Sequence, residues 1–357
     1  MIMDKFNLRD FLLEASRRHT SDIYFIAGSA ITLLISGKTF HIGERLMAPD
    51  TEHLAHELYR LAFRGNAEKV FDTGDDSFSF SLPGISRFRV SMFRQCNTYG
   101  AIIRMTPFDI PSAKDLSIPD EVMGLCDIEN GLVLVTGLSG SGKTSTVACL
   151  LDRINHTHDG ELILTLEDPL EYVHRSANCI VTQREIYTDT ASYENALRAV
   201  KYQRAHVLML SDLPTPRVAL EALSIAQAGS LVLTTFHGNS AANAIQNFLD
   251  MFSVEKQAMI RAQLSSTLKA VVFQRLIPSQ DGTPVPVFEM IRIEDAVQTL
   301  LSEGNIPQIA EAIASSKTRT MIPFDLSLVN LFRSHRISYD TAIKYALDRN
   351  RIRRQLH

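Results

Sequence analysis

The feature that most constrains this chain is a glycine-rich segment near its middle. Residues 137–144 read Gly-Leu-Ser-Gly-Ser-Gly-Lys-Thr and match the pattern GxxxxGK[ST]. Glycines at these positions let successive backbone N–H groups converge on a phosphate without interference from a Cβ atom. An apolar run over 131–136 precedes the segment, and a helical pattern over 143–155 follows it. Because strand, loop and helix agree, the sequence predicts a P-loop that binds a nucleoside triphosphate.

The side chains of this loop have expected roles in holding the nucleotide. Lys143 would neutralise the β- and γ-phosphates, and the Thr144 hydroxyl would be a ligand of Mg²⁺. The helix that follows presents its positive N-terminus to the same anion. The predicted nucleotide-binding residues of the loop are Gly137, Ser139, Gly140, Ser141, Gly142, Lys143, Thr144 and Ser145.

The chain has 357 residues, which is enough for two domains with separate cores. Residues 1–106 combine helical patterns over 1–18 and 51–63 with five short strand patterns, and predict a small mixed α/β domain. The five strand patterns cover 22–26, 31–35, 77–81, 87–93 and 101–105. Prolines punctuate residues 107–119, which we interpret as a linker.

Residues 120–357 have a different hydrophobic pattern, because short apolar runs alternate with longer helical patterns. Such alternation predicts a doubly wound α/β domain around a parallel sheet. The expected strands are 132–136, 162–166, 207–210 and 231–235, and the expected helices are 143–155, 192–203 and 216–227. Beyond residue 255 the sequence predicts mainly helix, apart from a strand over Val285–Ile291.

Composition and charge limit the kinds of partner and the cellular compartment that we expect for this protein. The net charge is −4, so no global basic field favours nucleic acid, and no nucleic-acid partner is expected. No window approaches the ~20 apolar residues of a membrane span, and residues 1–18 lack the apolar core of a signal peptide. The four cysteines form no CxxC pair. We expect a cytoplasmic protein that contacts membranes only through partners.

Acidic residues follow two of the apolar strand patterns. Glu167 and Asp168 end the run 162–166, at the sheet edge that holds the ligand in open α/β folds. A carboxylate there could orient the water that attacks the γ-phosphate. Asp168 could equally cap a helix that begins at Pro169. Asp212 ends the next run and has the position of a Walker B acid, although apolar strands ending in aspartate are common.

One histidine and several arginines are weaker candidates. His237 ends the run 231–235 at the same expected edge and could contact the γ-phosphate, although a lone histidine is more often structural. Alternation along 87–93 places Arg87 and Arg89 on one strand face, and Arg104 lies on a neighbouring strand. These arginines could cover a solvated face, or in an oligomer could reach the phosphates of a neighbouring subunit.

Taken in order, the motifs resemble those of the PilT-type ATPases of the type II/type IV secretion superfamily, the hexameric motors that retract type IV pili. The similarity covers nearly the whole chain. It is carried by Ser21-Asp22, Phe78–Gly84, Arg87–Val90, the P-loop, Ile163–Glu171, Gln183–Glu185, Thr235–His237 and Gln274–Pro278.

The resemblance implies a fold, a set of roles and partners. It implies a PAS-like first domain, a RecA-like second domain with a mainly helical C-terminal end, and ATP with Mg²⁺ as ligands. Glu167 matches the catalytic base and His237 the γ-phosphate sensor, while Asp212 falls at the Walker B position. Arg89 and Arg104 match arginines that approach nucleotide within the ring. The implied partners are a homo-hexamer, or a mixed ring with a paralogue, and a pilus platform protein of the inner membrane.

The chain departs from the family pattern at Walker B. Family members usually read Gly-Glu-x-Arg-Asp, whereas residues 211–215 read Ser-Asp-Leu-Pro-Thr. A carboxylate displaced by about 1 Å can lower a rate about 10²-fold. The late segment 296–303 also lacks the arginines of its family counterpart. Two alternatives to a retraction motor therefore stay open: a weakly active or inactive nucleotide-binding subunit that regulates an active paralogue, and an ATPase of a secretion or conjugation system.

Overall fold

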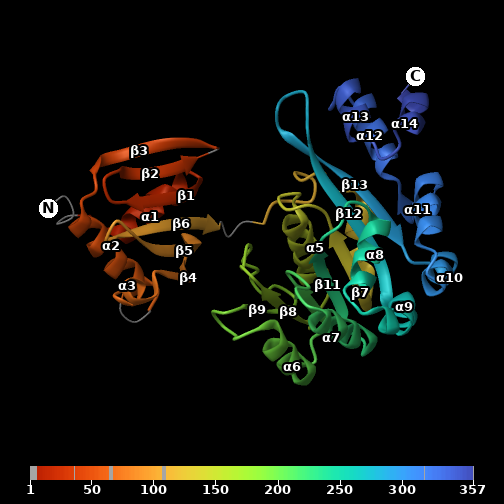
Figure 1. Cartoon of the computed structure of the whole chain (residues 1–357), viewed down its shortest axis with the longest axis horizontal. Helices are drawn as coiled ribbons and strands as arrows, with labels where there is room; N and C mark the ends of the chain where they lie inside the picture. Colours follow the sequence, from red (N-terminus) through yellow and green to blue (C-terminus); the bar gives the residue numbers. More distant parts are fainter. Residues whose placement is uncertain (1–5, 36, 64–66, 107–109, 317, 357) are drawn as a thin grey trace. The chain divides into compact units, whose positions relative to one another are not determined.

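A computed structural model of the chain describes residues 6–35, 37–63, 67–106, 110–316 and 318–356 (Figure 1). The chain divides into two compact units. One consists of Met1–Asp109 and Glu171–Val173, and the other consists of Ile110–Leu170 and His174–His357. Both units combine helices with a sheet, but their sheets differ in strand direction.

The first unit is built on a six-stranded antiparallel sheet with the order β3-β2-β1-β6-β5-β4. Helices α1 and α2 pack on β1, and α2 also packs on β6. The elements are α1 (Leu8–Arg17), β1 (Thr20–Ile26), β2 (Ala30–Ile35), β3 (Lys38–Arg45), α2 (Ala48–Leu61), α3 (Lys69–Thr73), β4 (Asp75–Leu82), β5 (Ser86–Gln95) and β6 (Thr98–Thr106).

Alternation along the strands creates the core of this unit. On β5, Phe88, Val90 and Met92 are fully buried, while Arg87 and Arg89 lie on the opposite face. The sequence did not predict β3, and the structure explains why. Seven of its eight residues are exposed, because β3 lies at the edge of the sheet, and its apolar alternation is limited to Phe40 and Ile42.

The second unit is built on an eight-stranded sheet with the order β14-β13-β12-β7-β11-β10-β8-β9. Strands β12, β7, β11, β10, β8 and β9 are parallel, β13 runs antiparallel to β12, and β14 runs antiparallel to β13. The elements up to β11 are α4 (Asp120–Met123), a 3₁₀ turn (Gly124–Asp127), β7 (Gly131–Thr136), α5 (Lys143–Thr157), β8 (Leu162–Glu167), β9 (Ile180–Glu185), α6 (Tyr193–Gln203), β10 (Val207–Leu210), α7 (Pro216–Gln227) and β11 (Leu231–Phe236).

Helices cover both faces of this sheet, which is why its central strands are apolar throughout. All six residues of β7 are buried. Leu132 and Leu134 face a core shared with α6, α7, α8 and α9, whereas Val133 and Val135 face a core shared with α5. The doubly wound arrangement predicted from the apolar runs is confirmed, and with it the fold class: an α+β unit followed by a RecA-like unit.

The remaining elements form the C-terminal part of the second unit. They are α8 (Ala241–Asp250), α9 (Val254–Thr267), β12 (Leu268–Pro278), β13 (Pro284–Arg292), α10 (Asp295–Glu303), α11 (Ile306–Ser315), β14 (Met321–Ile322), α12 (Phe324–Arg333), α13 (Tyr339–Tyr345) and α14 (Arg349–Leu356). Helices α12, α13 and α14 pack against β12 and β13 around Phe273, Val287 and Phe324.

The prediction that Val285–Ile291 is the one strand in this region was wrong. Residues 268–278 form β12, an eleven-residue strand between β7 and β13. Most of its side chains are buried, but Lys269, Gln274 and Arg275 interrupt the apolar residues, so neither strict alternation nor a continuous apolar run marks the strand.

Candidate nucleotide site

Strand β7 ends in the glycine-rich loop, and the loop leads directly into α5. Gly137, Gly140 and Gly142 have φ angles of 151°, 74° and 87°, which L side chains rarely adopt. A Cβ atom on Gly137 would lie 2.3 Å from the carbonyl oxygen of Gln274, and one on Gly142 would lie 2.8 Å from Gln274 Nε2. Glycine is therefore required at both positions. Within the loop the Ser141 amide donates to Leu138 O at 3.2 Å, which closes a tight turn between the two glycines.

The polar side chains of the loop fit a phosphate group. Lys143 Nζ lies 3.0 Å from Gly137 O and 2.9 Å from Leu138 O, so the ammonium lies folded over the loop. The hydroxyls of Thr136 and Ser141 are buried and have no hydrogen-bond partner among the described residues. Buried hydroxyls without partners are unfavourable, and an anion in the loop would give them one. Ser139 is exposed, and Thr144 and Ser145 lie half-buried in the first turn of α5.

The carboxyl ends of the parallel strands bring the other candidate residues to the same edge of the sheet. From the P-loop strand outward the order is β7, β11, β10 and β8. Neighbouring strands lie about 4.8 Å apart. His237 follows β11 and is therefore nearest to the P-loop strand, Asp212 follows β10, and Glu167 ends β8.

Glu167 is a buried carboxylate held by two side-chain donors. It is 3% exposed, and its Oε1 accepts hydrogen bonds from Thr165 Oγ1 at 2.6 Å and from Gln183 Nε2 at 3.0 Å. Thr165 shares a strand face with Glu167, and Gln183 comes from neighbouring β9. The backbone amide of His174 donates to Gln183 Oε1 at 2.7 Å, which orients the amide group of Gln183 toward Glu167. The carboxylate is therefore fixed in position, as a general base requires.

Asp168 lies beside Glu167 but is exposed. The interpretation of Asp168 as a helix cap was wrong, because no helix begins at Pro169 and the residues after it are irregular. The Asp168 amide instead donates to Ser211 Oγ at 2.8 Å. Asp168 thus links the ends of β8 and β10.

The end of β10, where the sequence predicts the Walker B acid, is organised around Ser211. Ser211 O accepts a hydrogen bond from Thr235 Oγ1 at 2.5 Å, and Ser211 Oγ lies 2.7 Å from the hydroxyl of Tyr193. Burial raises the pKa of Tyr193 above its ordinary value, so this phenol stays neutral. The next residue, Asp212, is half-buried, and its Oδ1 accepts the amide of Leu213 at 2.8 Å. One carboxylate oxygen is thus turned back to its own backbone.

His237 is exposed at the end of β11, and its backbone is hydrogen-bonded to α8. Asn247 Nδ2 of α8 donates to His237 O at 3.2 Å. Because Phe236 pairs with Thr136 in the sheet, His237 follows the strand residue that lies beside the start of the P-loop. Its predicted contact with a γ-phosphate stays a prediction.

Arg89 and Arg104 lie in the first unit. They are direct cross-strand partners on β5 and β6. Arg104 Nε lies 3.1 Å from Asp22 Oδ1, and the Arg104 side chain is 72% exposed. An exposed guanidinium can contact a further group, and the predicted approach of these arginines to nucleotide remains a prediction.

No group of three or more histidine, cysteine or acidic side chains that could hold a metal occurs in the described parts of the chain. A protein cage for Mg²⁺ is not needed, since Mg²⁺ is commonly held by one or two protein oxygens together with substrate phosphates and water. Thr144 and Asp212 are the residues predicted to supply those oxygens.

Three residues of the site were not predicted from the residue patterns: Gln183, Ser211 and Gln274. Gln183 and Gln274 lie in motifs that resemble the family, but nothing in their spacing reveals a role. Gln274 acts through its closeness to the loop glycines, and Ser211 through its hydroxyl at the end of β10. Such contacts follow from strand order, which the sequence patterns leave open.

Comparison with known proteins identifies the family. The family described as type II/IV secretion system protein matches residues 8–283. This chain belongs to that family. Within it the chain is PilT-like. It is 33% identical to the type IV pilus retraction ATPase PilT of Pseudomonas aeruginosa over 344 residues, which cover 94% of this chain and 97% of PilT.

Two further relatives support the same placement. The type IV pilus ATPase PilU of Pseudomonas aeruginosa is 30% identical over 339 residues, covering 93% of this chain and 87% of PilU. A crystal structure of the pilus retraction motor PilT with bound ADP matches with a TM-score of 0.89 and 32% identity, covering 98% of this chain and 100% of that one. Among the helices that the structure describes, none has the length and apolar character needed to cross a membrane.

Proposed function

We propose that this member of the secretion ATPase family binds ATP with Mg²⁺ and hydrolyses ATP as a hexameric motor of the retraction type in a type IV pilus machine. The observation that carries this function is the fixed Glu167 carboxylate at the edge of the sheet that also holds the P-loop. The two features supply what hydrolysis requires, a cradle for phosphates and a positioned base.

The residues of the site have distinct tasks in this reaction. The P-loop amides and Lys143 bind the phosphates and offset their charge. Glu167 accepts a proton from the attacking water, and His237 contacts the γ-phosphate. Mg²⁺, held by Thr144 and Asp212, would stabilise charge on the transferred phosphoryl group. In the ring, Arg89 or Arg104 of one subunit would approach nucleotide bound to its neighbour, and an inner-membrane platform protein would receive the force.

A second function has an observation of its own. Asp212 is shorter than glutamate, and its Oδ1 is already bonded to the Leu213 amide. A site with an intact cradle and a displaced Walker B acid would bind ATP but turn it over slowly. The chain would then be an accessory subunit that regulates an active paralogue, alone or in a mixed ring. A role in secretion or conjugation is less favoured, because the relatives with matched length and more than 30% identity include a pilus retraction ATPase.

Steady-state phosphate release by the assembled protein separates the two functions. A motor predicts ATP turnover at least a hundredfold above that of Lys143→Ala, which removes the phosphate-binding ammonium. An accessory subunit predicts tight ATP binding, measured separately with a fluorescent analogue, and turnover no faster than that of Lys143→Ala. The second result would contradict the motor function while leaving nucleotide binding intact.

A further inference from the structure

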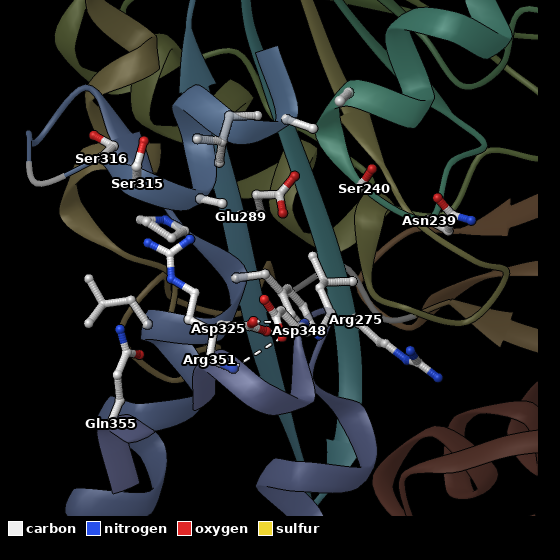
Figure 2. Close-up of a pocket in the computed structure, with 18 residues that line it drawn as sticks. Asn239, Ser240, Arg275, Glu289, Ser315, Ser316, Asp325, Asp348, Arg351 and Gln355 are labelled. Atoms are coloured by element: carbon white, nitrogen blue, oxygen red, sulfur yellow. Dashed lines mark hydrogen bonds between the residues drawn. The ribbon is translucent and has the colours of Figure 1, made fainter. Parts of the chain in front are cut away.

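A buried carboxylate far from the P-loop in sequence holds the start of α8. Glu289 of β13 is 3% exposed, and its Oε1 accepts a 2.6 Å hydrogen bond from the amide of Ala241, the first residue of that helix. Ser240 Oγ accepts the amide of Asn243 in the same turn. The first amides of a helix have no partner within the helix. Glu289 therefore supplies an acceptor that sequence-local capping does not. It lines a cavity of about 710 Å³ (Figure 2).

The start of α8 in turn sets the position of His237. Only three residues separate His237 from Ala241, and each is held to α8. Asn239 N donates to Asn243 Oδ1 at 3.0 Å, and a Cβ atom on Gly238 would lie 3.0 Å from Ala244 Cβ. His237 itself accepts a bond from α8 through its carbonyl oxygen. Any shift of the first turn of α8 would therefore carry His237 with it.

The neighbouring strand holds the P-loop in a comparable way. Gln274 of β12 is buried, and its Oε1 accepts a 2.6 Å hydrogen bond from Thr146 Oγ1 in the first turn of α5. Its carbonyl oxygen and side-chain amide are the groups that exclude a Cβ atom at Gly137 and Gly142. Gln274 therefore fixes both the loop and the helix that follows it.

These two residues belong to adjacent rungs of one hairpin. Phe273 pairs with Glu289, and Gln274 pairs with Phe288. Paired residues of an antiparallel ladder are held at about 4.5–5.5 Å between Cα atoms, so the spacing of the two anchors is set by the backbone. Helix α12 packs behind the same rungs, since Ser327 Oγ donates to Phe288 O at 2.8 Å.

We propose that Glu289 and Gln274 are positioning residues for the hydrolysis of ATP, and that the β12–β13 hairpin fixes the distance between the P-loop and His237. Glu289 acts through His237, and Gln274 through the loop that holds Lys143. This inference rests on the proposed function, because it assigns the two residues to the same site. The hairpin also connects the C-terminal helices to that site, because Ser327 of α12 is hydrogen-bonded to Phe288 of β13.

Single and double variants of the full chain test the role of Glu289. Glu289→Ala should lower kcat at least tenfold with KM for ATP changed less than twofold. Glu289→Gln keeps an acceptor oxygen for the Ala241 amide, so it should retain at least half of the wild-type kcat. Asp348→Asn is the matched control, because Asp348 lines the same cavity and its Oδ1 accepts the amides of Asn350 and Arg351 at the start of α14. It should leave kcat unchanged.

A double mutant distinguishes positioning from general destabilisation. In a His237→Ala background, Glu289→Ala should lower kcat less than twofold further, because the side chain through which Glu289 acts is already absent. An equal loss of kcat in both backgrounds would overturn the proposal. Thermal unfolding of each variant identifies any that do not fold. If Glu289→Ala is one of them, Glu289→Leu, which keeps the bulk of the side chain but offers no acceptor to the Ala241 amide, takes its place with the same expected loss.

Hydrogen–deuterium exchange makes the test independent of turnover. Glu289→Ala should speed amide exchange over residues 238–244 at least tenfold, whereas Asp348→Asn should leave it unchanged. If the wild type fails to hydrolyse ATP but the exchange result holds, the proposed motor fails and the positioning contact stands. Unchanged exchange in Glu289→Ala would show that Glu289 does not hold the His237 segment.

Discussion

The hydroxyl oxygen of Ser211 accepts a 2.8 Å hydrogen bond from the backbone amide of Asp168. Ser211 also accepts a bond from Thr235 at its carbonyl oxygen, so one residue joins the ends of β8, β10 and β11. Glu167, Asp212 and His237 each lie within two residues of these contacts. The segment at which the sequence predicts the Walker B acid is therefore an ordered junction, and we expect its departure from the family pattern to act through the shorter side chain at position 212.

A longer acidic side chain at position 212 should restore the position of its carboxylate. We expect Asp212→Glu to raise kcat about tenfold or more, since one methylene moves a carboxylate by about 1 Å and such a shift can change a rate about 10²-fold. Nucleotide affinity should stay within twofold, because the P-loop is untouched. Phosphate release and titration with a fluorescent nucleotide check both. A kcat equal to or below the wild-type value would show that the length of the acid does not limit turnover.

The amide of Gln183 should matter for rate and little for binding. Gln183→Ala removes one of the two side-chain donors to the buried Glu167 and leaves that carboxylate less well placed. We expect kcat to fall about tenfold with unchanged affinity for ADP. Thr182→Ala, an exposed neighbour on β9, should behave as wild type. Equal kcat for the two variants would contradict the assigned role of Gln183.

Much of the fold could be predicted from periodicity and the P-loop. The buried runs that became β7, β8, β10 and β11 were recognisable because a sheet covered on both faces needs continuous apolar strands. β3 and β12 were missed for different reasons. β3 is an exposed edge strand with only two apolar residues that alternate, and β12 is a largely buried strand whose apolar residues are interrupted by Lys269, Gln274 and Arg275.

The candidate site likewise contains residues that the sequence could place and residues that it could not. Residues adjacent to a recognisable strand end, such as Glu167 and His237, could be placed from the sequence. Gln183, Gln274 and Glu289 could not, because each acts across the sheet on a residue at least sixteen positions away. Strand order decides which distant residues meet, and short-range patterns do not contain that order.

The stability of the protein should depend on pH through Glu289. Burial raises its pKa from 4.5 to about 7, with Asp325 adding to the rise and the Ala241 amide opposing it. The folded state thus binds a proton more tightly than the unfolded state. The stability contributed by this group is complete below pH 4.5 and is lost as the pH rises through about 7.

Glu289→Gln should remove this dependence. Between pH 5 and pH 8 the wild type should lose up to about 3 kcal/mol relative to the variant. The difference in urea midpoint between the two proteins at each pH measures the effect. Arg275, Arg351 and Asp348 line the same cavity and are present in both proteins, so the difference reports Glu289 together with the Asp325 carboxylate that interacts with it. A difference independent of pH would contradict the raised pKa.

The cysteines should differ in reactivity. Cys96 is exposed, whereas Cys126, Cys149 and Cys179 are buried. Burial raises the pKa of Cys126 to about 12 and that of Cys149 to about 11, so few of these thiols ionise at neutral pH. A maleimide at pH 7 should therefore label one thiol per native chain, at Cys96, and four after denaturation. Rapid native labelling of Cys126 or Cys149 would contradict their burial.

Single-turnover hydrolysis by Glu167→Gln tests the central claim most directly, because it separates binding from chemistry at the residue on which the function depends. Glutamine keeps the size of the side chain and can still bond to Thr165, but it cannot accept a proton from water. We predict that the variant binds ATP within twofold of the wild-type affinity and hydrolyses it at least a hundredfold more slowly. Hydrolysis at the wild-type rate would contradict the assignment of Glu167 as the base, and with it the mechanism proposed for this chain.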